Sequence, residues 1–314
     1  MRTVKLFYTA LILFGIVLGT NAQTQSSAST EIRLQGARFV NPLIEKWIFE
    51  YSRTHGNVKI ELNTSPDQEP DASLQLIDEA TVPAGEKLVF SGRYALLPVA
   101  NVHNPLLEEL ERKGIDKKLL KKIYFEKDVF SDEGQAKEDQ KWNQLTVYAR
   151  NAQAGTSQLF AGYFGDVPTR LRGKKINGDD FFLVSALRRD SLGLSFNHLG
   201  YLYDLQSRTI KEGLLPLPIE LGSGRKNKIL INGATSLDVV IQTLQNEPSE
   251  LIPTTRFAFR YKAGSEKQAV LEDFLKWVAT EGQVYNNQFG ILNLDAQTIA
   301  QQTKNWNESF ITAR

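Results

Sequence analysis

Strand-like and helix-like segments alternate along almost the whole sequence, and this alternation restricts the chain to an α/β architecture. The first unit is a strand at 32–34, a helix at 41–51 and a strand at 58–62, which we expect to lie parallel to the first strand. A second strand, tight loop and helix follow between residues 144 and 164. The sequence shows no internal repeat of the kind that marks a solenoid.

The remaining elements follow from the same periodicities. Further strands are expected at 88–90, 94–102, 193–203, 214–220 and 255–261. Further helices are expected at 105–112, 117–125 with Asp116 as the cap, 181–189, 236–245, 268–281 and 295–310. The run at 94–102 is unusually apolar, which is typical of a strand that passes from one lobe of a protein to another.

The first 22 residues have the layout of a secretory signal peptide. Arg2 and Lys5 precede an apolar run over 6–18, and small residues follow it up to Ala22. The run is shorter than the roughly 18–20 residues that a membrane-spanning helix needs. We therefore expect cleavage after Ala22 and export to the periplasm or cell envelope. A retained N-terminal anchor is the alternative.

Composition excludes several classes of function. Lys and Arg number 37 against 36 Asp and Glu, so the chain has no basic excess that would indicate nucleic-acid binding. The sequence contains no cysteine, which rules out disulfides, thiolate metal sites, cysteine nucleophiles and a lipid-modified cysteine. No later segment is long and apolar enough for stable membrane insertion. The chain after residue 22 is long enough to form two lobes.

Two strand-to-helix junctions, at 36–41 and 150–157, carry the most informative residue types. In an open α/β sheet, ligands bind beyond the carboxyl ends of strands, where a helix start offers free N–H groups and the positive end of its dipole. Arg150 adds a guanidinium suited to an oxyanion, Gly155 permits close approach and Thr156 offers a hydroxyl. Together, the two junctions predict an anion clamp, a site that holds an anion from two sides. Two ordinary capped helices with an incidental arginine are the alternative.

Patterns for enzymatic chemistry are missing. His55, His103 and His198 have no metal-ligand spacing to one another. The segment 193–197 lacks the last glycine of a nucleophile elbow, and 222–226 lacks the spacing of a phosphate-binding loop and is expected to be a turn. We therefore predict a chain that is not an enzyme and needs no metal or cofactor.

The two junctions resemble the ligand loops of the phosphate-binding proteins of bacterial ABC transporters. The similar residues are 36–39 at the first junction, and 147–150 followed by 154–156 at the second. Later landmarks of that family follow in its order at 200–201, 252–256 and 274–283. The resemblance implies a type II periplasmic-binding-protein fold, in which two α/β lobes are joined by two crossing hinge strands, here near 94–101 and 254–261.

The resemblance also implies a domain division and a function. Lobe I would comprise 23–97 and 258–314, and lobe II 98–257, after the signal peptide at 1–22. The protein would be a monomer that captures a small inorganic oxyanion, phosphate, between the lobes and delivers it to an ABC transporter permease. An envelope sensor or interaction protein that kept the fold and lost phosphate binding is the alternative.

Ligand-binding positions are carried over residue by residue. They are Arg38, Phe39, Arg150, Ala154, Gly155 and Thr156. Arg38 stands where the family has a small hydroxyl residue, and Ala154 stands where it has a serine. The family's aspartate, which accepts a hydrogen bond from the protonated ligand, has no clear equivalent in the sequence. Because sulfate lacks that proton, we expect poor discrimination between phosphate and sulfate.

Overall fold

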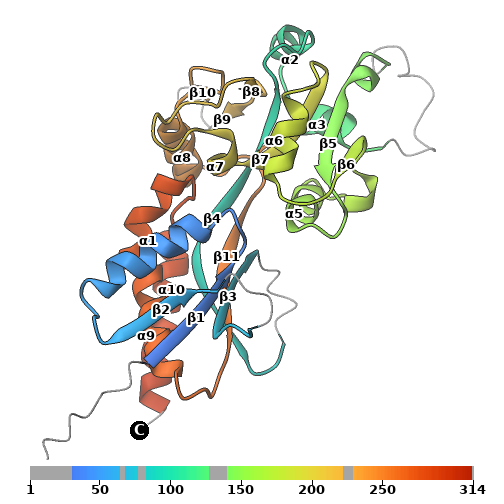
Figure 1. The fold of residues 1–314 in the computed structure, drawn as a ribbon. Helices are drawn as coiled ribbons and strands as arrows, with labels where there is room; N and C mark the ends of the chain where they lie inside the picture. Colours follow the sequence, from blue (N-terminus) through green and yellow to red (C-terminus); the bar gives the residue numbers. More distant parts are fainter. Residues whose placement is uncertain (1–29, 64–67, 77–82, 127–139, 222–228, 313–314) are drawn as a thin grey trace, which may run out of the picture.

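The computed structural model describes residues 30–63, 68–76, 83–126, 140–221 and 229–312. Within these ranges the chain forms two α/β lobes, drawn one above the other in Figure 1. The signal peptide expected at 1–22 and the turn expected at 222–226 lie outside the described residues, so both stay predictions.

Lobe I contains strands in the order β2-β1-β3-β11-β4. Their bounds are Thr30–Gly36 for β1, Val58–Leu62 for β2, Ala72–Leu76 for β3, Glu86–Asn101 for β4 and Thr254–Lys262 for β11. β1 and β2 are parallel, with Ile32 opposite Ile60, which confirms the expected pairing. β1 also runs parallel to β3, so their carboxyl ends, Gly36 and Leu76, lie at the same edge of the sheet.

Helices pack against this sheet and bury its apolar face. They are α1 (Asn41–Ser52), α9 (Gln268–Ala279), the 3-10 helix η5 (Glu281–Phe289) and α10 (Ala296–Thr312). Trp47 of α1 is fully buried, and its indole N–H donates to the carbonyl of Gly282 at 3.0 Å. This bond ties α1 to η5, so segments far apart in the sequence close one core.

β4 crosses from one lobe to the other. Its first half pairs with β11, where Ala95 lies opposite Thr254, and its second half pairs with β7, where Leu96 lies opposite His198. Residues 94–101 are all buried, so the strands expected at 88–90 and 94–102 form one long strand. In Figure 1, β4 and β11 run side by side between the lobes. The lobe boundaries at 97/98 and 257/258 stay a prediction.

Lobe II continues the sheet from β4 through β7 (Gly193–His198), β5 (Thr146–Arg150) and β6 (Lys174–Ile176), with β8 (Leu214–Pro216) also on β4. Its helices include α2 (Leu107–Lys113), α3 (Lys117–Tyr124), α5 (Gly155–Tyr163), α6 (Phe181–Leu187) and α8 (Leu237–Asn246), with 3-10 turns η3 (Gln140–Gln144) and η4 (Pro168–Arg170). The core centres on the ring of Phe160, which stacks on Phe196 at 3.7 Å. Asp116 caps α3 as expected, because its carboxylate accepts from the backbone N–H of Leu119.

Two strand expectations in lobe II are wrong. The strand expected at 193–203 ends at His198, whose ring accepts from the N–H of Gly200 and starts the short helix α7 (Leu199–Leu202). The strand expected at 214–220 breaks into β8 and β9 (Glu220–Leu221), and β9 pairs with β10 (Ile229–Leu230). In both cases an apolar run continues past the strand end, and periodicity alone does not show the change of direction.

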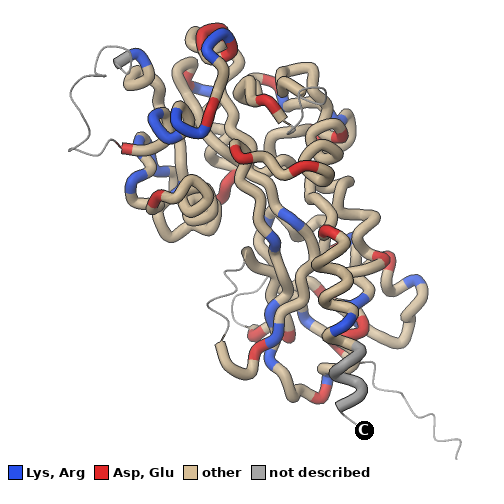
Figure 2. The backbone as a smooth tube through the Cα atoms, turned by 180° about the vertical axis from the view of Figure 1, so that it is seen from behind, with Lys and Arg blue, Asp and Glu red and all other residues tan. Residues whose placement is uncertain are grey.

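The surface mixes both signs of charge. Figure 2 shows Lys and Arg interspersed with Asp and Glu over both lobes. Within the described ranges, no helix has the length and apolar character that a membrane crossing requires.

Candidate functional site

A cavity of about 730 Å3 lies between the two lobes. Lobe I lines it with residues 35–39 and 73–76, and lobe II with 154–156, 178–180 and three single residues, Arg150, Phe182 and Tyr201. All six residues that the sequence analysis assigned to a ligand site line this cavity: Arg38, Phe39, Arg150, Ala154, Gly155 and Thr156. The two junctions therefore face one space, of a volume typical of small-molecule sites.

The second junction offers an open helix start. β5 ends at Arg150 and α5 begins at Gly155, with Ala154 at the N-cap and no side chain capping the helix. Among the described residues, none accepts a hydrogen bond from the backbone N–H groups of Gly155 and Thr156. These donors, together with the positive end of the helix dipole, favour a negative group in the cavity.

The first junction differs from the expected clamp. α1 starts at Asn41, but the Asn41 side chain does not cap it, and its Oδ1 is buried without a partner. The N–H groups of Val40 and Asn41 bond back to the carbonyls of Ala37 and Arg38 in a tight turn. The start of α1 is therefore less available to a ligand than that of α5, and lobe I contributes the exposed Arg38 side chain and the Phe39 ring instead.

Arg150 is paired with a carboxylate inside the cavity. Its Nη1 lies 2.7 Å from Asp180 Oδ1, and the Thr156 hydroxyl donates to the same oxygen at 3.2 Å. Only 16% of the Arg150 side chain and 12% of the Asp180 side chain are exposed. Burial raises the pKa of Asp180, although the charge of Arg150 opposes this shift. The Nε of Arg150 is buried and has no partner among the described residues.

A second carboxylate, Asp179, lies beside the first. Its Oδ1 accepts from the Tyr201 hydroxyl and from the Phe181 N–H, both at 2.9 Å. The turn that carries both aspartates needs Gly178, whose φ of +100° is in the left-handed region. The Asn197 amide holds the carbonyl of Asp180 at 2.8 Å. Both acidic side chains are thus fixed in place before any ligand binds.

Aromatic rings join the lobes beneath the cavity. Phe39 of lobe I packs on Tyr94 at 4.8 Å and on His198 at 5.0 Å, and Tyr94 stacks on His198. Tyr94 and His198 are fully buried, and both the Tyr94 hydroxyl and His198 Nε2 are without a hydrogen-bond partner in the described structure. Because His198 Nδ1 accepts from Gly200, its proton is assigned to Nε2. Burial lowers the pKa of His198 to about 3.

The two carboxylates were not predicted from the sequence, and Tyr201 was noted only as part of the landmark at 200–201. Asp180 directly precedes α6, where an aspartate is normally a helix cap, but it forms no cap hydrogen bond and turns to Arg150 instead. The signal that could have indicated the site is the acidic pair itself, which follows a glycine at the start of an apolar helix. The expectation that the site lacks a carboxylate is therefore wrong.

The described residues contain no candidate metal centre. Among the residues that the structure describes, no group of three or more His, Asp or Glu side chains is arranged to hold a metal ion.

Comparison with known proteins identifies the fold. No protein-family profile and no curated protein sequence matches the chain. The structure is similar to a phosphate ABC transporter substrate-binding protein from Clostridium perfringens, solved with bound phosphate, with a TM-score of 0.56 at 13% identity over 85% of this chain and 100% of that chain. It is also similar to an ABC-type phosphate transport receptor from Vibrio cholerae, with a TM-score of 0.52 at 14% identity over 84% and 100%.

These likenesses confirm the expected α/β architecture, the two-lobed type II periplasmic-binding-protein fold, and the resemblance in fold to the phosphate-binding proteins. The two solved proteins are binding components of transporters. At such low identity, the likeness concerns the fold.

Proposed function

We propose that the chain is an exported solute-binding protein that captures a small oxyanion between its lobes and delivers it to an ABC transporter permease. Inorganic phosphate is the simplest candidate ligand. The observation that carries the proposal is the convergence of the Arg150 guanidinium and the open start of α5 on one cavity whose other wall belongs to lobe I. The fold of the similar transport proteins supports it.

The cavity supplies the groups that an oxyanion needs. The N–H groups of Gly155 and Thr156 can donate to its oxygens, while the Arg150 guanidinium, which lines the cavity, adds a positive charge. Asp180 can accept a hydrogen bond from a protonated phosphate and would repel sulfate. With carboxylates in the cavity, the expected poor discrimination between these anions no longer follows, and we expect phosphate to be preferred.

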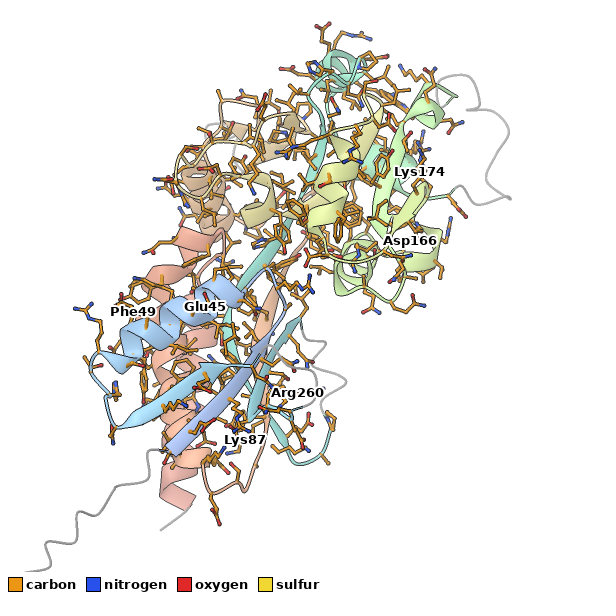
Figure 3. All side chains as sticks on the ribbon, in the orientation of Figure 1. Glu45, Phe49, Lys87, Asp166, Lys174 and Arg260 are labelled. Atoms are coloured by element: carbon orange, nitrogen blue, oxygen red, sulfur yellow. The ribbon has the colours of Figure 1, made fainter. Side chains whose placement is uncertain are left out.

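Titration calorimetry of purified protein with phosphate and with sulfate tests the proposal. Arg150→Ala should weaken phosphate binding by about 2–5 kcal/mol, because the variant leaves the anion and Asp180 without their cation. Lys174→Ala is the matched control: it removes an exposed cation from the same lobe, outside the cavity lining (Figure 3). Unchanged phosphate binding in Arg150→Ala would place the ligand site elsewhere.

One observation favours a second candidate, an envelope sensor or interaction protein that has lost small-ligand binding. Arg150 is already neutralised by Asp180 without a ligand, so the pair could be a purely structural ion pair. Thermal melting separates the two functions, since a ligand at about 100 times its dissociation constant adds roughly 2.7 kcal/mol of stability. If no oxyanion raises the melting temperature, the sensor is the better account.

A further inference from the structure

The cavity is larger than a bare inorganic anion, and its lining carries both signs of charge. A water molecule takes about 30 Å3 of liquid volume, so a single tetrahedral oxyanion fills only a small part of the 730 Å3. The charged lining residues are two cations, Arg38 and Arg150, and two acidic residues, Asp179 and Asp180. An inorganic anion that binds to Arg150 therefore also meets two carboxylates.

The two carboxylates keep unused hydrogen-bonding capacity. Arg150 and Thr156 both bind Oδ1 of Asp180, and Tyr201 binds Oδ1 of Asp179. In the described part of the chain, no hydrogen bond reaches Oδ2 of either residue. A cationic donor between these oxygens would use capacity that the protein leaves open.

A buried hydroxyl is influenced by the charges of the same two carboxylates. Tyr94 is fully buried and its hydroxyl has no partner in the described residues. Burial is the main cause that raises the pKa of Tyr94, and the charges of Asp180 and Asp179 raise it further. Tyr94 does not line the cavity, so its hydroxyl is not assigned to the ligand.

Apolar side chains from both lobes also line the cavity. Leu76 of lobe I approaches the start of α5 so closely that a Cβ on Gly155 would lie 3.3 Å from its Cδ1. Phe182 of lobe II is 48% exposed and also lines the cavity, as do Leu74 and Phe39. These side chains offer apolar surface to a ligand with carbon atoms, whereas an inorganic anion would leave them in contact with water.

We propose that the ligand is a zwitterion, with its oxyanion at Arg150 and the start of α5, its ammonium group between Asp179 and Asp180, and a short aliphatic linker along Leu76 and Phe182. This inference rests on the proposed function, because it keeps the same oxyanion site. It narrows the substrate class from inorganic anions to amino-substituted organic oxyanions.

An isosteric ligand pair tests the ammonium group directly. Calorimetric titration compares 2-aminoethylphosphonate with propylphosphonate, in which a methyl group replaces the ammonium. We expect the amino compound to bind at least about tenfold more tightly than both propylphosphonate and inorganic phosphate. Taurine with propanesulfonate, and β-alanine with butyrate, repeat the comparison for sulfonate and carboxylate, and so identify which oxyanion the site takes.

Asp179→Asn adds a residue-level test. It should reduce the preference for the amino compound to about threefold or less, and propylphosphonate should bind more tightly than to the wild type, because one carboxylate near the anion loses its charge. Asp166→Asn, a matched change elsewhere on lobe II (Figure 3), should leave the preference intact. Equal binding of the isosteric pairs, or tighter binding of phosphate, overturns the inference and keeps the proposed function. If none of these anions binds, the proposed function fails and the inference falls with it. The comparison of the isosteric ligand pairs on the wild-type protein tests the inference even if Asp179→Asn does not fold.

Discussion

At the residue scale, the pairing of Arg150 with Asp180 decides how the cleft can bind an anion. Nη1 of Arg150 is engaged by Asp180 at 2.7 Å and Nε is buried, so an anion in the cavity meets a guanidinium whose charge is already partly neutralised. Because burial raises the pKa of Asp180, the residue takes up a proton more readily than an exposed aspartate. An ammonium group beside Asp180 would offset its charge in the same way as that proton.

His198 makes folding stability depend on pH. Burial, and secondarily the charge of Lys211, lowers the pKa of His198 from 6.5 to about 3. The folded state therefore holds His198 neutral. The contribution of this residue to folding stability is fully present above pH 6.5 and is lost as the pH falls toward 3. The titration of His198 alone should make the free energy of unfolding about 2 kcal/mol lower at pH 5 than at pH 7.

Denaturant unfolding between pH 7 and pH 5 measures this loss. His198→Asn keeps an acceptor for the Gly200 N–H but does not titrate, so its stability should change less with pH than that of the wild type. His103→Asn is the control, because it makes the same replacement at an exposed position. Identical pH profiles for wild type and His198→Asn would contradict the assignment.

At the scale of elements, the approach to β6 depends on a single glycine. Gly173 has a φ of +84°, and a Cβ there would lie 2.1 Å from the carbonyl oxygen of Val147 in β5. Gly173→Ala therefore combines backbone strain with a steric clash against the strand that ends at Arg150. Gly264→Ala isolates the strain, because Gly264 has a φ of +89° and open space around it.

We expect Gly264→Ala to cost about 1–2 kcal/mol and Gly173→Ala clearly more, as measured by thermal or denaturant unfolding. Anion binding should also weaken in Gly173→Ala, since β5 positions Arg150, and should stay unchanged in Gly264→Ala. Equal destabilisation in the two variants would show that the loop before β6 moves to accommodate the methyl group.

Strands and helices were predictable where one signal dominated. Alternating apolar residues indicated β1 and β2, and Asp116 indicated the start of α3. The break at His198 was not predictable, because the apolar run continues into α7 and the cap is a histidine ring. The acidic pair at the start of α6 was missed for a similar reason: its role depends on Arg150, a residue distant in sequence that only the folded sheet brings near.

At the scale of the whole molecule, the lobes are joined by more than the crossing strands. Arg208, in the loop between α7 and β8 of lobe II, donates to the carbonyl of Asn287 at 2.9 Å and to that of Gln288 at 3.3 Å, both near the end of η5 in lobe I. The side chain of Gln245 in α8 also accepts from the N–H of Asn293 at 2.7 Å. These bonds connect the lobes outside the cavity lining, so they bear on hinge motion without touching the proposed ligand.

The bonds of Arg208 to lobe I can be tested by removing its side chain. Arg208 has a φ of +63°, which strains any residue but glycine, so Arg208→Gly removes the bonds to lobe I and keeps the loop conformation. We expect relief of about 1–2 kcal/mol of strain to offset much of the lost hydrogen bonding, which leaves the melting temperature nearly unchanged. Small-angle X-ray scattering of the ligand-free variant should nevertheless show a larger radius of gyration, because the lobes can separate further. Asp238→Asn is the control: it weakens the ion pair of Arg208 with a carboxylate that is 65% exposed, and it leaves both bonds to lobe I in place. A scattering profile for Arg208→Gly identical to that of the wild type would show that β4, β11, the packing of Phe39 on His198 and the bond of Gln245 to Asn293 suffice to fix the lobes.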